Sequence, residues 1–397
     1  MRVSIEKGRP SGVASAPPAK SFAHRMLICS ALADAPGVVR GVYGSEDVLA
    51  TVGCLRQLCA DIKLDGDAAY VTPSAGEGGD LFCRESGSTL RFMIPLCLCS
   101  GRKITLHGAP RLLQRPLGVY EELCRDQGLI FEKSGDSVTV CGRPDLSDLT
   151  VDGSVSSQFV TGLMLAAPTT GADCRIRLTP PVVSRPYIEI TRSVMQTYGV
   201  KTVWEDENTL FIPGGQSYKA CDAQVEGDWS NAAFLFALGM IGSVAVSGLD
   251  PDSVQGDKAV LGQLAQLKNG HAKIDITDCP DNGPVLMAVA AANHGATLTG
   301  TSRLRAKESD RGEAMASELR KFGADVEVFE DRIEIASGIK EPREILCGHN
   351  DHRVVMALSV LLTLTGGQID GAEAVNKSWP DFFESLAALG IGVRKWN

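Results

Sequence analysis

Residues 318–338 read ELRKFGADVEVFEDRIEIASG, and this stretch predicts the fold unit of the chain. Its first part has the apolar spacing of a helix that ends near Gly323, and apolar and polar residues alternate on both sides of Glu330 and Asp331. A glycine directly after a helix allows the left-handed backbone that turns the chain into a strand. Two acidic residues between β-rich runs are typical of a hairpin turn. The stretch therefore predicts a helix followed by a hairpin of two strands.

The same order of helix, small residue and β-rich runs recurs along the chain. Further copies cover residues 55–73, 123–142, 195–214, 264–277 and 385–397. The junction residues are Ala60, Gly128, Gly199, Gly270, Gly323 and Gly390, which lie 53 to 71 residues apart. We therefore expect an α/β protein made of α+β repeats. It would contain six helix-plus-hairpin units, three in each half, with the helices packed together and the sheets outside them.

A length of 397 residues exceeds what one core usually supports, so two domains are expected. The segment EGDWSN, residues 226–231, is expected to mark one crossing between them, and ASAPPAKS, residues 14–21, the other. We predict an N-terminal domain over residues 14–225 and a C-terminal domain over residues 1–13 plus 226–397. The first strand of the chain would then belong with the C-terminal half.

Composition narrows the class of protein. The formal net charge of −9 disfavours nucleic-acid binding through a broad basic surface. The twelve cysteines form no C-x-x-C pair and have no nearby histidine at zinc-ligand spacing, so we expect buried free thiols and no metal site. The N-terminus lacks an apolar signal core, and no apolar run is long enough to span a membrane. A cytoplasmic protein without a membrane partner is therefore expected.

Helix starts in the first half carry cations and hydroxyl groups. Lys20, Ser21 and Arg25 follow two prolines and enter the helical run MLICSALA, so they are expected at a helix N-terminus that favours an anion. The i to i+4 spacing predicts that Ser21 and Arg25 share one face. The segment ESGSTLR, residues 85–91, opens the apolar run FMIPLCLC, and its small residues would let the backbone approach a ligand.

Three further groups in the first half carry donors. Arg115 could hold a carboxylate or phosphate at two points, and the following Pro116 suits a first helical position. Ser156, Ser157 and Gln158 open another helix, and Ser184, Arg185 and Tyr187 could complete a site for a polyhydroxylated ligand that carries phosphate.

The second half carries a charged constellation. Asp281 precedes the helix GPVLMAVAAA and could be an N-cap or a base. Residues 303–311, RLRAKESDR, place four cations at a helix start, where the helix dipole disfavours them unless anions bind. Residues 350–353, NDHR, enter an apolar helix, and Lys377 is expected to open the last helix. Cations at nearly every helix start predict a strongly anionic ligand.

In this order the motifs closely resemble the 5-enolpyruvylshikimate-3-phosphate (EPSP) synthase family. The resemblance runs through AKSFAHR, ESGSTLRF, QRPLG, SSQF, SRPYIEIT, EGDWSNAAFL, PD, RLRAKESDR, NDHR and KSWPDFF. It implies a two-domain inside-out α/β barrel with two hinge crossings. It also implies transfer of enolpyruvate from phosphoenolpyruvate to the 5-hydroxyl of shikimate-3-phosphate, a step toward chorismate and the aromatic amino acids. No cofactor is implied, and members are usually monomers.

The resemblance also assigns residues. The implied ligands of shikimate-3-phosphate are Lys20, Ser21, Arg25, Ser156, Ser157, Gln158, Ser184, Tyr187, Asp281 and Lys307. The implied ligands of phosphoenolpyruvate are Lys20, Gly87, Arg115, Gln158, Arg311, Arg353 and Lys377. The implied catalytic groups are Lys20, Asp281, Glu308, His352 and Lys377. The N-terminal domain would mainly bind shikimate-3-phosphate, and the C-terminal domain would mainly bind phosphoenolpyruvate and carry the catalysis.

Some assignments stay open at this point. Asp281 is the expected base, whereas either Glu308 or Lys377 could protonate C3 of phosphoenolpyruvate. The roles of Glu85 and Arg303 also stay open, because family members carry other residues there. Gly87 matches the glycine whose small size lets the inhibitor glyphosate share the phosphoenolpyruvate site, so sensitivity to glyphosate is expected.

Two rival functions remain. A related transferase acts on UDP-N-acetylglucosamine and usually carries a reactive cysteine in a mobile loop, but residues 108–116 here read GAPRLLQRP. A metabolite-binding protein without catalysis could use the same cations, although Asp281, Glu308 and Lys377 argue for an enzyme.

Overall fold

The computed structural model describes residues 1–396, and its contacts divide the chain into two compact units. We call Lys20–Glu226 the N-terminal unit, and Met1–Ala19 with Gly227–Asn397 the C-terminal unit. The first boundary lies after Ala19 rather than after residue 13. The reason is that strand β2 (Ser11–Ser15) pairs in parallel with β15 (Ser243–Ser247), and Pro18 forms a bridge to Gly227. These contacts keep residues 14–19 with the C-terminal unit.

Three four-stranded sheets of one pattern make up the N-terminal unit, in the orders β14-β3-β5-β4, β6-β7-β9-β8 and β10-β11-β13-β12. In each order the first two strands are parallel and the remaining neighbours are antiparallel. The strands are β3 (Gly37–Arg40), β4 (Ala60–Asp65), β5 (Ala68–Pro73), β6 (Asp80–Phe82), β7 (Ile104–His107), β8 (Ile130–Lys133), β9 (Ser137–Cys141), β10 (Asp148–Asp152), β11 (Cys174–Thr179), β12 (Val203–Trp204), β13 (Thr209–Ile212) and β14 (Ala223–Gln224).

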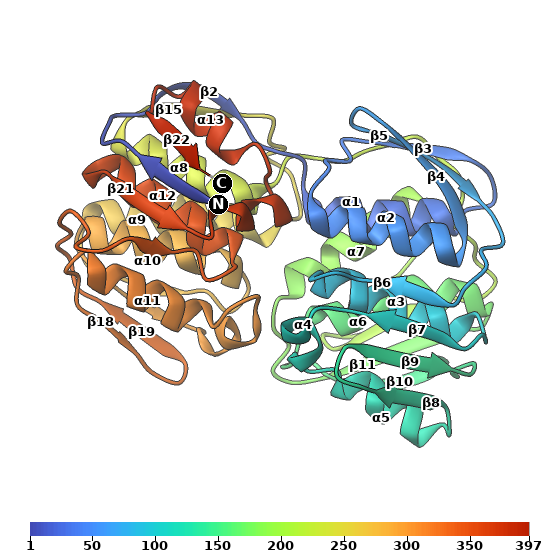
Figure 1. Ribbon diagram of the computed structural model, residues 1–397. Helices are drawn as coiled ribbons and strands as arrows, with labels where there is room; N and C mark the ends of the chain where they lie inside the picture. Colours follow the sequence, from blue (N-terminus) through green and yellow to red (C-terminus); the bar gives the residue numbers. More distant parts are fainter. Residues whose placement is uncertain (397) are drawn as a thin grey trace. The chain divides into compact units, whose positions relative to one another are not determined.

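The C-terminal unit repeats this pattern in two sheets, β16-β17-β19-β18 and β20-β21-β1-β22, and adds the two-stranded sheet β15-β2. Its other strands are β1 (Arg2–Ile5), β16 (Ala272–Asp275), β17 (Ala296–Thr299), β18 (Val326–Val328), β19 (Arg332–Ile335), β20 (Leu346–Cys347), β21 (Gly367–Asp370) and β22 (Val393–Trp396). Strand β1 lies between β21 and β22, so the chain start and the last strand lie side by side (Figure 1). The prediction that the first strand belongs with the C-terminal half is therefore confirmed.

The predicted hairpins are confirmed in four of the six repeats. In the stretch 318–338, Gly323 has φ +87° after the helix, and β18 pairs antiparallel with β19. Residues 55–73, 123–142 and 195–214 form the hairpins β4–β5, β8–β9 and β12–β13. Two hairpin predictions are wrong. Strand β16 pairs in parallel with β17, and β22 pairs with β1, because neither repeat supplies a second β-rich run of its own.

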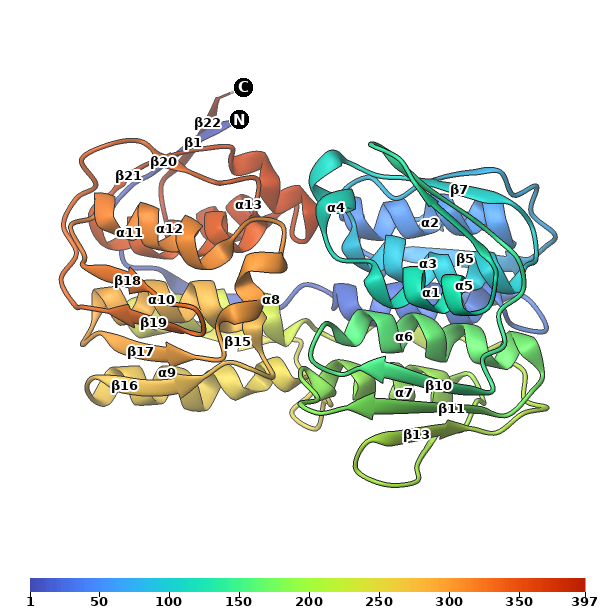
Figure 2. The same ribbon diagram turned by 90° about the horizontal axis from the view of Figure 1, so that it is seen from below.

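Helices of each unit pack on one another beneath these sheets. They are α1 (Lys20–Ala31), α2 (Glu46–Leu58), α3 (Gly87–Cys99), α4 (Pro110–Gln114), α5 (Gly118–Asp126), α6 (Ser157–Ala166), α7 (Arg185–Thr197), α8 (Trp229–Ile241), α9 (Val260–Asn269), α10 (Gly283–Ala292), α11 (Arg311–Lys321), α12 (His352–Thr365) and α13 (Phe382–Ala388). Helix α3 packs against α6, and α10 against α12 (Figure 2). Helices such as α10 (GPVLMAVAAA) are apolar all round, so they must be buried on all sides. Their polar ends are therefore left to carry the chemistry.

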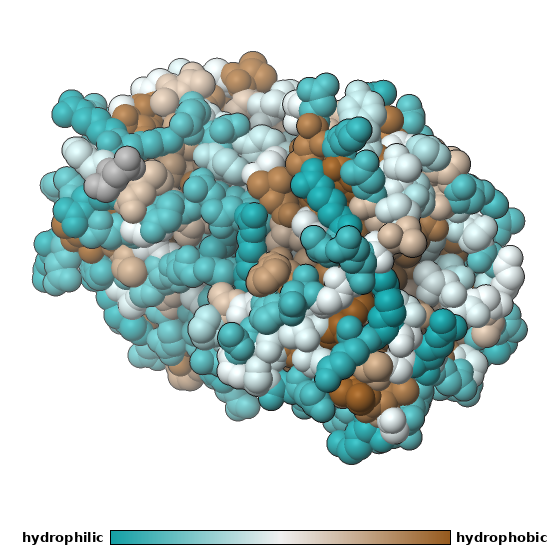
Figure 3. All heavy atoms as spheres, turned by 45° about the vertical axis from the view of Figure 1, so that its right-hand side comes forward, coloured by the Kyte–Doolittle hydropathy of each residue, from teal (hydrophilic) through white to brown (hydrophobic). Residues whose placement is uncertain are grey.

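The surface shown in Figure 3 is mostly hydrophilic, with apolar side chains in small groups between the polar ones. Most of the cysteines are buried, all twelve are free thiols, and Cys347 is exposed. Within residues 1–396, no helix is both long and apolar enough to cross a membrane.

Candidate active site

Helix starts in the N-terminal unit are joined by hydrogen bonds. Lys20 is the first residue of α1, and its Nζ donates to Oδ2 of Asp47, in the first turn of α2, at 2.8 Å. The Oγ1 of Thr89, in the first turn of α3, donates to the carbonyl of Asp47 at 3.3 Å. Three helix N-termini are thus held together, and the ammonium of Lys20 is fixed among them. No local pattern singles out Asp47, because its partner Lys20 lies 27 residues away in the chain.

Gly87 and Arg115 lie side by side in this unit. Ser86 caps α3 by accepting from the backbone N–H of Thr89 at 3.2 Å, and Gly87 is the first helical residue. A Cβ added at Gly87 would lie 2.6 Å from Nη1 of Arg115. Arg115 is 8% exposed, and its buried Nε has no hydrogen-bond partner within residues 1–396. A buried cation against a helix N-terminus is suited to a phosphate or carboxylate. Arg115 directly follows the short helix α4, and α5 begins at Gly118, so the expectation that Pro116 opens a helix is wrong.

Gln158 is oriented by its neighbours. Its Oε1 accepts from Nη1 of Arg91 at 2.9 Å, and its Nε2 donates to Oγ of Ser88 at 3.1 Å. Ser156 caps α6 by accepting from the backbone N–H of Gln158 at 3.3 Å, and Ser157 is buried as the first helical residue. The start of α6 is therefore tied to the start of α3. Arg91 was part of a quoted motif, but its role in fixing the amide was missed.

Arg25 is fixed inside the unit. Its Nη1 donates to the carbonyl of Ser21 at 2.6 Å, which confirms that the two residues share a helix face. Its Nε donates to Thr191 at 2.8 Å, and its Nη2 to Thr161 and the carbonyl of Tyr187 at 3.2 Å. Burial lowers the pKa of Arg25 to about 10, so it remains a cation at neutral pH. The guanidinium joins α1, α6 and α7.

The start of α7 carries the last of the predicted site residues in this unit, Ser184 and Tyr187. Ser184 precedes the helix with φ +55° and is 1% exposed, and the backbone N–H of Tyr187 donates to its carbonyl at 3.1 Å. Arg185, by contrast, lies over the ring of Trp204 and donates to the carbonyl of Glu207 at 2.7 Å. The hydroxyl-bearing residues thus lie at helix starts, whereas Arg185 contacts the β12–β13 turn.

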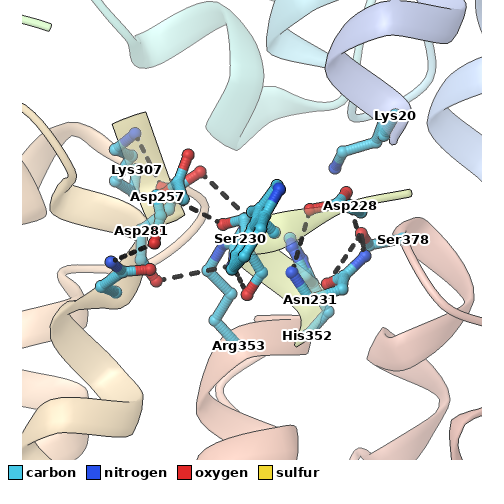
Figure 4. A network of polar contacts seen from close by, with 12 residues as sticks. Lys20, Asp228, Ser230, Asn231, Asp257, Asp281, Lys307, His352, Arg353 and Ser378 are labelled. Carbon is cyan, nitrogen blue, oxygen red and sulfur yellow. Dashed lines mark hydrogen bonds and ion pairs between the residues drawn. The ribbon is translucent and has the colours of Figure 1, made fainter. Parts of the chain in front are cut away.

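In the C-terminal unit, Asp281 lies among three cations. Its Oδ1 is 3.1 Å from Nζ of Lys307, and its Oδ2 is 3.1 Å from Nη2 of Arg353 (Figure 4). Its Oδ1 also lies 2.7 Å from Nη1 of Arg311. Burial alone would raise the pKa of Asp281, but the cations outweigh burial and hold this pKa well below its usual value. Asp281 lies in a 3-10 turn, Pro280–Asn282, and does not cap α10. The N-cap alternative is therefore wrong.

Arg311 is the centre of a buried ion network. It is 1% exposed and begins α11. Besides Asp281, it contacts Glu308 from Nη2 at 2.6 Å and Asp351 from Nε at 2.8 Å. Asp351 is fully buried and caps α12 by accepting from the backbone N–H of Arg353 at 3.0 Å. The starts of α11 and α12 are thus joined through one guanidinium, which explains the cation at this helix start.

Lys307 and Arg305 differ although they are two residues apart. Lys307 has a side chain that is 20% exposed, and burial lowers its pKa to about 8, although the charge of Asp281 opposes this. Arg305 is directed elsewhere, since its Nη2 donates to the carbonyl of Phe329 at 3.0 Å. The cations in residues 303–311 therefore point to two different parts of the unit, Lys307 to Asp281 and Arg305 to the carbonyl of Phe329.

Lys377 and His352 lie close to this network in the fold. Nζ of Lys377 donates to the carbonyl of Asn350 at 2.6 Å, and the residue is 4% exposed. Lys377 ends a 3-10 turn, Ala372–Lys377, five residues before α13, so the prediction that it opens the last helix is wrong. His352 is 1% exposed in the first turn of α12.

A buried polar layer at the start of α8 supports these groups. Asp228 caps the helix by accepting from the backbone N–H of Asn231 at 2.9 Å, and the amide of Asn231 donates to Oγ of Ser378 at 3.0 Å. Ser230 donates to Asp257 at 3.2 Å (Figure 4). The segment EGDWSN was predicted as a boundary, and its support for the residues around Lys377 was missed.

Both units therefore present cations and helix N-termini of the kind that binds small anions. A model of the EPSP synthase (3-phosphoshikimate 1-carboxyvinyltransferase) family matches residues 6–386. The 3-phosphoshikimate 1-carboxyvinyltransferase of Clostridium kluyveri is 35% identical, with 100% of this chain and 99% of the relative covered. The enzyme of that name from Brachyspira hyodysenteriae is 34% identical, with 94% and 95% covered. This chain belongs to the EPSP synthase family.

Solved structures agree on the fold. An EPSP synthase from Acinetobacter baumannii matches with a TM-score of 0.79 and 23% identity, over 99% of this chain and 100% of that one. A second structure from the same organism gives a TM-score of 0.80 at 21% identity. The predicted two-domain fold of repeated helix-plus-sheet units is confirmed.

Proposed function

We propose that this protein transfers the enolpyruvyl group of phosphoenolpyruvate to the 5-hydroxyl of shikimate-3-phosphate. The hydroxyl oxygen bonds to C2 of phosphoenolpyruvate while C3 gains a proton. The tetrahedral adduct then loses that C3 proton and its phosphate, which leaves the enolpyruvyl ether and inorganic phosphate. The reaction needs cations for two phosphates and a carboxylate, a base for the alcohol, and an acid for C3.

The observation that carries this proposal is the group of three cations, Lys307, Arg311 and Arg353, around the carboxylate of Asp281. The guanidinium of Arg311 also binds the carboxylate of Glu308. A site for an inert anion would need only the cations. Here the carboxylate of Asp281 lies among the cations, so the groups that would bind an anionic substrate surround the group that would act as the base. Membership of the family supports shikimate-3-phosphate, rather than UDP-N-acetylglucosamine, as the acceptor.

Each residue group receives a proposed role. For shikimate-3-phosphate we assign Lys20, Ser21, Arg25, Ser156, Ser157, Gln158, Ser184, Tyr187, Asp281 and Lys307. For phosphoenolpyruvate we assign Lys20, Gly87, Arg115, Gln158, Arg311, Arg353 and Lys377. For the chemistry we assign Lys20, Asp281, Glu308, His352 and Lys377. The N-terminal unit would mainly bind shikimate-3-phosphate, and the C-terminal unit would bind phosphoenolpyruvate and carry the reaction.

The low pKa of Asp281 adds a condition to its role as base. A carboxylate that three cations hold in its charged form is a weak base. The phosphate and carboxylate of phosphoenolpyruvate would compete for Arg311 and Arg353, which raises the pKa of Asp281 toward the range in which it can take the hydroxyl proton. Binding of one substrate would therefore activate the base for the other.

We expect the enzyme to act in the cytoplasm as a monomer. Size-exclusion chromatography would test the oligomeric state.

The test is a phosphate-release assay with the purified full chain. Shikimate-3-phosphate and phosphoenolpyruvate together should release phosphate, while either one alone should not. Asp281→Asn, which keeps the shape but removes the base, should lower kcat by roughly 100-fold or more. Phosphate release with UDP-N-acetylglucosamine, and none with shikimate-3-phosphate, would overturn the assignment of the acceptor. No release with either acceptor, together with retained binding of phosphoenolpyruvate, would instead identify a binding protein.

A further inference from the structure

Helix α11 carries a buried carboxylate, Glu318, that the proposed reaction does not use. Glu318 lies seven residues after Arg311, about two helical turns away and therefore on the same side of the helix. Its side chain is 2% exposed. Oε1 accepts from Nε2 of His349 at 2.8 Å, and Oε2 accepts from the backbone N–H of Cys347 at 2.9 Å. Nζ of Lys321 lies 2.9 Å from Oε2.

These contacts keep Glu318 charged. Burial alone would raise the pKa of Glu318, but the bonds from His349, Cys347 and Lys321 outweigh it, and the pKa is lowered. A buried carboxylate with several donors is costly to form and rigid once formed. Glu318 is therefore a fixed anchor on α11 for the segment that follows β20.

That segment has an unusual backbone. His349 and Asn350 have φ of +48° and +52°, although neither is glycine. Left-handed backbone is unfavourable for residues with a Cβ, and two such residues in succession persist only where the surroundings fix them. The hydrogen bond between the ring of His349 and Glu318 is one contact that fixes this backbone. The backbone N–H of Cys347 on the same carboxylate supplies another, because it holds the residue where the segment begins.

The strained segment leads directly to groups of the proposed site. The carbonyl of Asn350 accepts from Nζ of Lys377 at 2.6 Å. The next residue, Asp351, caps α12 and binds Arg311 at 2.8 Å. A change of backbone angle at His349 or Asn350 would turn that carbonyl away from Lys377. The geometry of the segment thus sets the position of one hydrogen-bond acceptor of this ammonium.

We propose that Glu318 and His349 are a positioning pair for the reaction. They hold residues 347–351 so that His349 and Asn350 keep the left-handed backbone, which orients the carbonyl of Asn350 and, through it, the ammonium of Lys377 toward phosphoenolpyruvate. Neither residue of the pair touches substrate. The role in catalysis rests on the proposed function, whereas the control of Lys377 by the pair does not.

The central experiment compares Glu318→Gln with a matched control. Glutamine keeps the volume, but its amide N–H group replaces an acceptor at Cys347 and Lys321. Glu384→Gln removes an exposed carboxylate that pairs with Lys395 in the same unit, and it should change nothing. We expect Glu318→Gln to raise KM for phosphoenolpyruvate roughly tenfold. KM for shikimate-3-phosphate should stay within about twofold of the wild-type value, since most of its assigned ligands lie in the N-terminal unit.

A role in stability alone would give another pattern. Fewer folded molecules would lower apparent kcat and leave both KM values unchanged, and this result would overturn the proposal. His349→Gln is the second variant in case Glu318→Gln folds poorly, because the His349 side chain is 30% exposed and its loss is milder. It should raise KM for phosphoenolpyruvate in the same direction, and an unchanged KM in a folded variant would likewise overturn the proposal.

A readout without substrates separates this inference from the proposed function. In the ligand-free protein, the rate at which N-hydroxysuccinimide acetate modifies Lys377 can be followed by mass spectrometry. Lys377 is 4% exposed in the wild type, so its modification should be slow, and Glu318→Gln should accelerate it severalfold while Lys258 keeps its rate. Absence of turnover in the wild type would refute the proposed function only. An unchanged rate for Lys377 in Glu318→Gln would refute the positioning pair.

Discussion

Replacement of Arg311 by methionine is the strongest test of the ion network. Methionine keeps an unbranched side chain but removes the charge. Glu308 and Asp351 then lose the guanidinium that lies 2.6 Å and 2.8 Å from them in the wild type. Removal of one partner from a buried ion pair typically costs about 3–5 kcal/mol. For a unit of this size, that loss corresponds to a decrease in Tm of roughly 6–20 °C. The effect is large because Arg311 is 1% exposed and Asp351 is fully buried.

Urea unfolding followed by tryptophan fluorescence measures this loss, because Trp229 and Trp379 are buried in the same unit. Arg394→Met is the control. Its guanidinium pairs with Glu6 at 3.3 Å, but the side chains are 74% and 58% exposed, so no measurable change is expected.

The pH dependence of the loss tests its electrostatic cause. In the wild type, cations depress the pKa of Asp281, so its contribution to stability is present above the pKa of the unfolded chain and is lost as pH falls through the folded pKa. In Arg311→Met, Asp281 loses one of the three cations that depress its pKa, so this pKa rises toward its usual value, and lower pH relieves the repulsion between Asp281 and the neighbouring carboxylates. The difference between the two proteins should therefore be largest near pH 7 and shrink toward about pH 4. A loss below about 1 kcal/mol, or one that is equal at both pH values, would refute this reasoning.

Three further predictions follow from single contacts. Gly87→Ala would place a Cβ 2.6 Å from Nη1 of Arg115, and because a flexible side chain can move, stability should hardly change. KM for phosphoenolpyruvate and the inhibition constant of glyphosate should both rise roughly tenfold in steady-state kinetics, and unchanged values would count against Arg115 as a ligand. Since the pKa of Lys307 is about 8, kcat/KM for shikimate-3-phosphate should fall as pH rises through 8 and the ammonium loses its proton, and Lys307→Arg should move that limb to higher pH. Gly162→Ala would bring a Cβ within 2.4 Å of Oη of Tyr120, between α6 and the neighbouring backbone of α3. Urea unfolding should therefore show a decrease of about 1–3 kcal/mol in the free energy of unfolding. An unchanged free energy would mean that these helices can separate.

The helix starts were predictable because their signals are local. Ser86, Ser156 and Asp351 each accept a bond from a backbone N–H two or three residues ahead, and this pattern needs no distant partner. Gly323 has a positive φ because it follows a helix directly, so its effect is also local. The shared face of Ser21 and Arg25 likewise followed from helical periodicity alone.

Partners far apart in the sequence could not be predicted in this way. Lys20 pairs with Asp47, and Arg311 with Asp351, only because repeated units bring separate helix starts together. The sequence suggested that Asp281 could be a cap, but three cations from other segments made it a charged centre with a lowered pKa. The same limit explains the error at the last repeat, where the missing hairpin strand is β1 from the other end of the chain.

The sequence by itself determined the repeated unit, the helices that begin with basic or hydroxyl residues, and the family. Periodicity, capping residues and glycine positions act over a few residues, so one chain suffices to read them. Only the tertiary structure decided which helix starts meet, which cations surround Asp281, and which segment is held in a left-handed backbone beside Lys377. Those features depend on burial and on charges brought together across the fold, and neither exists before the chain has folded.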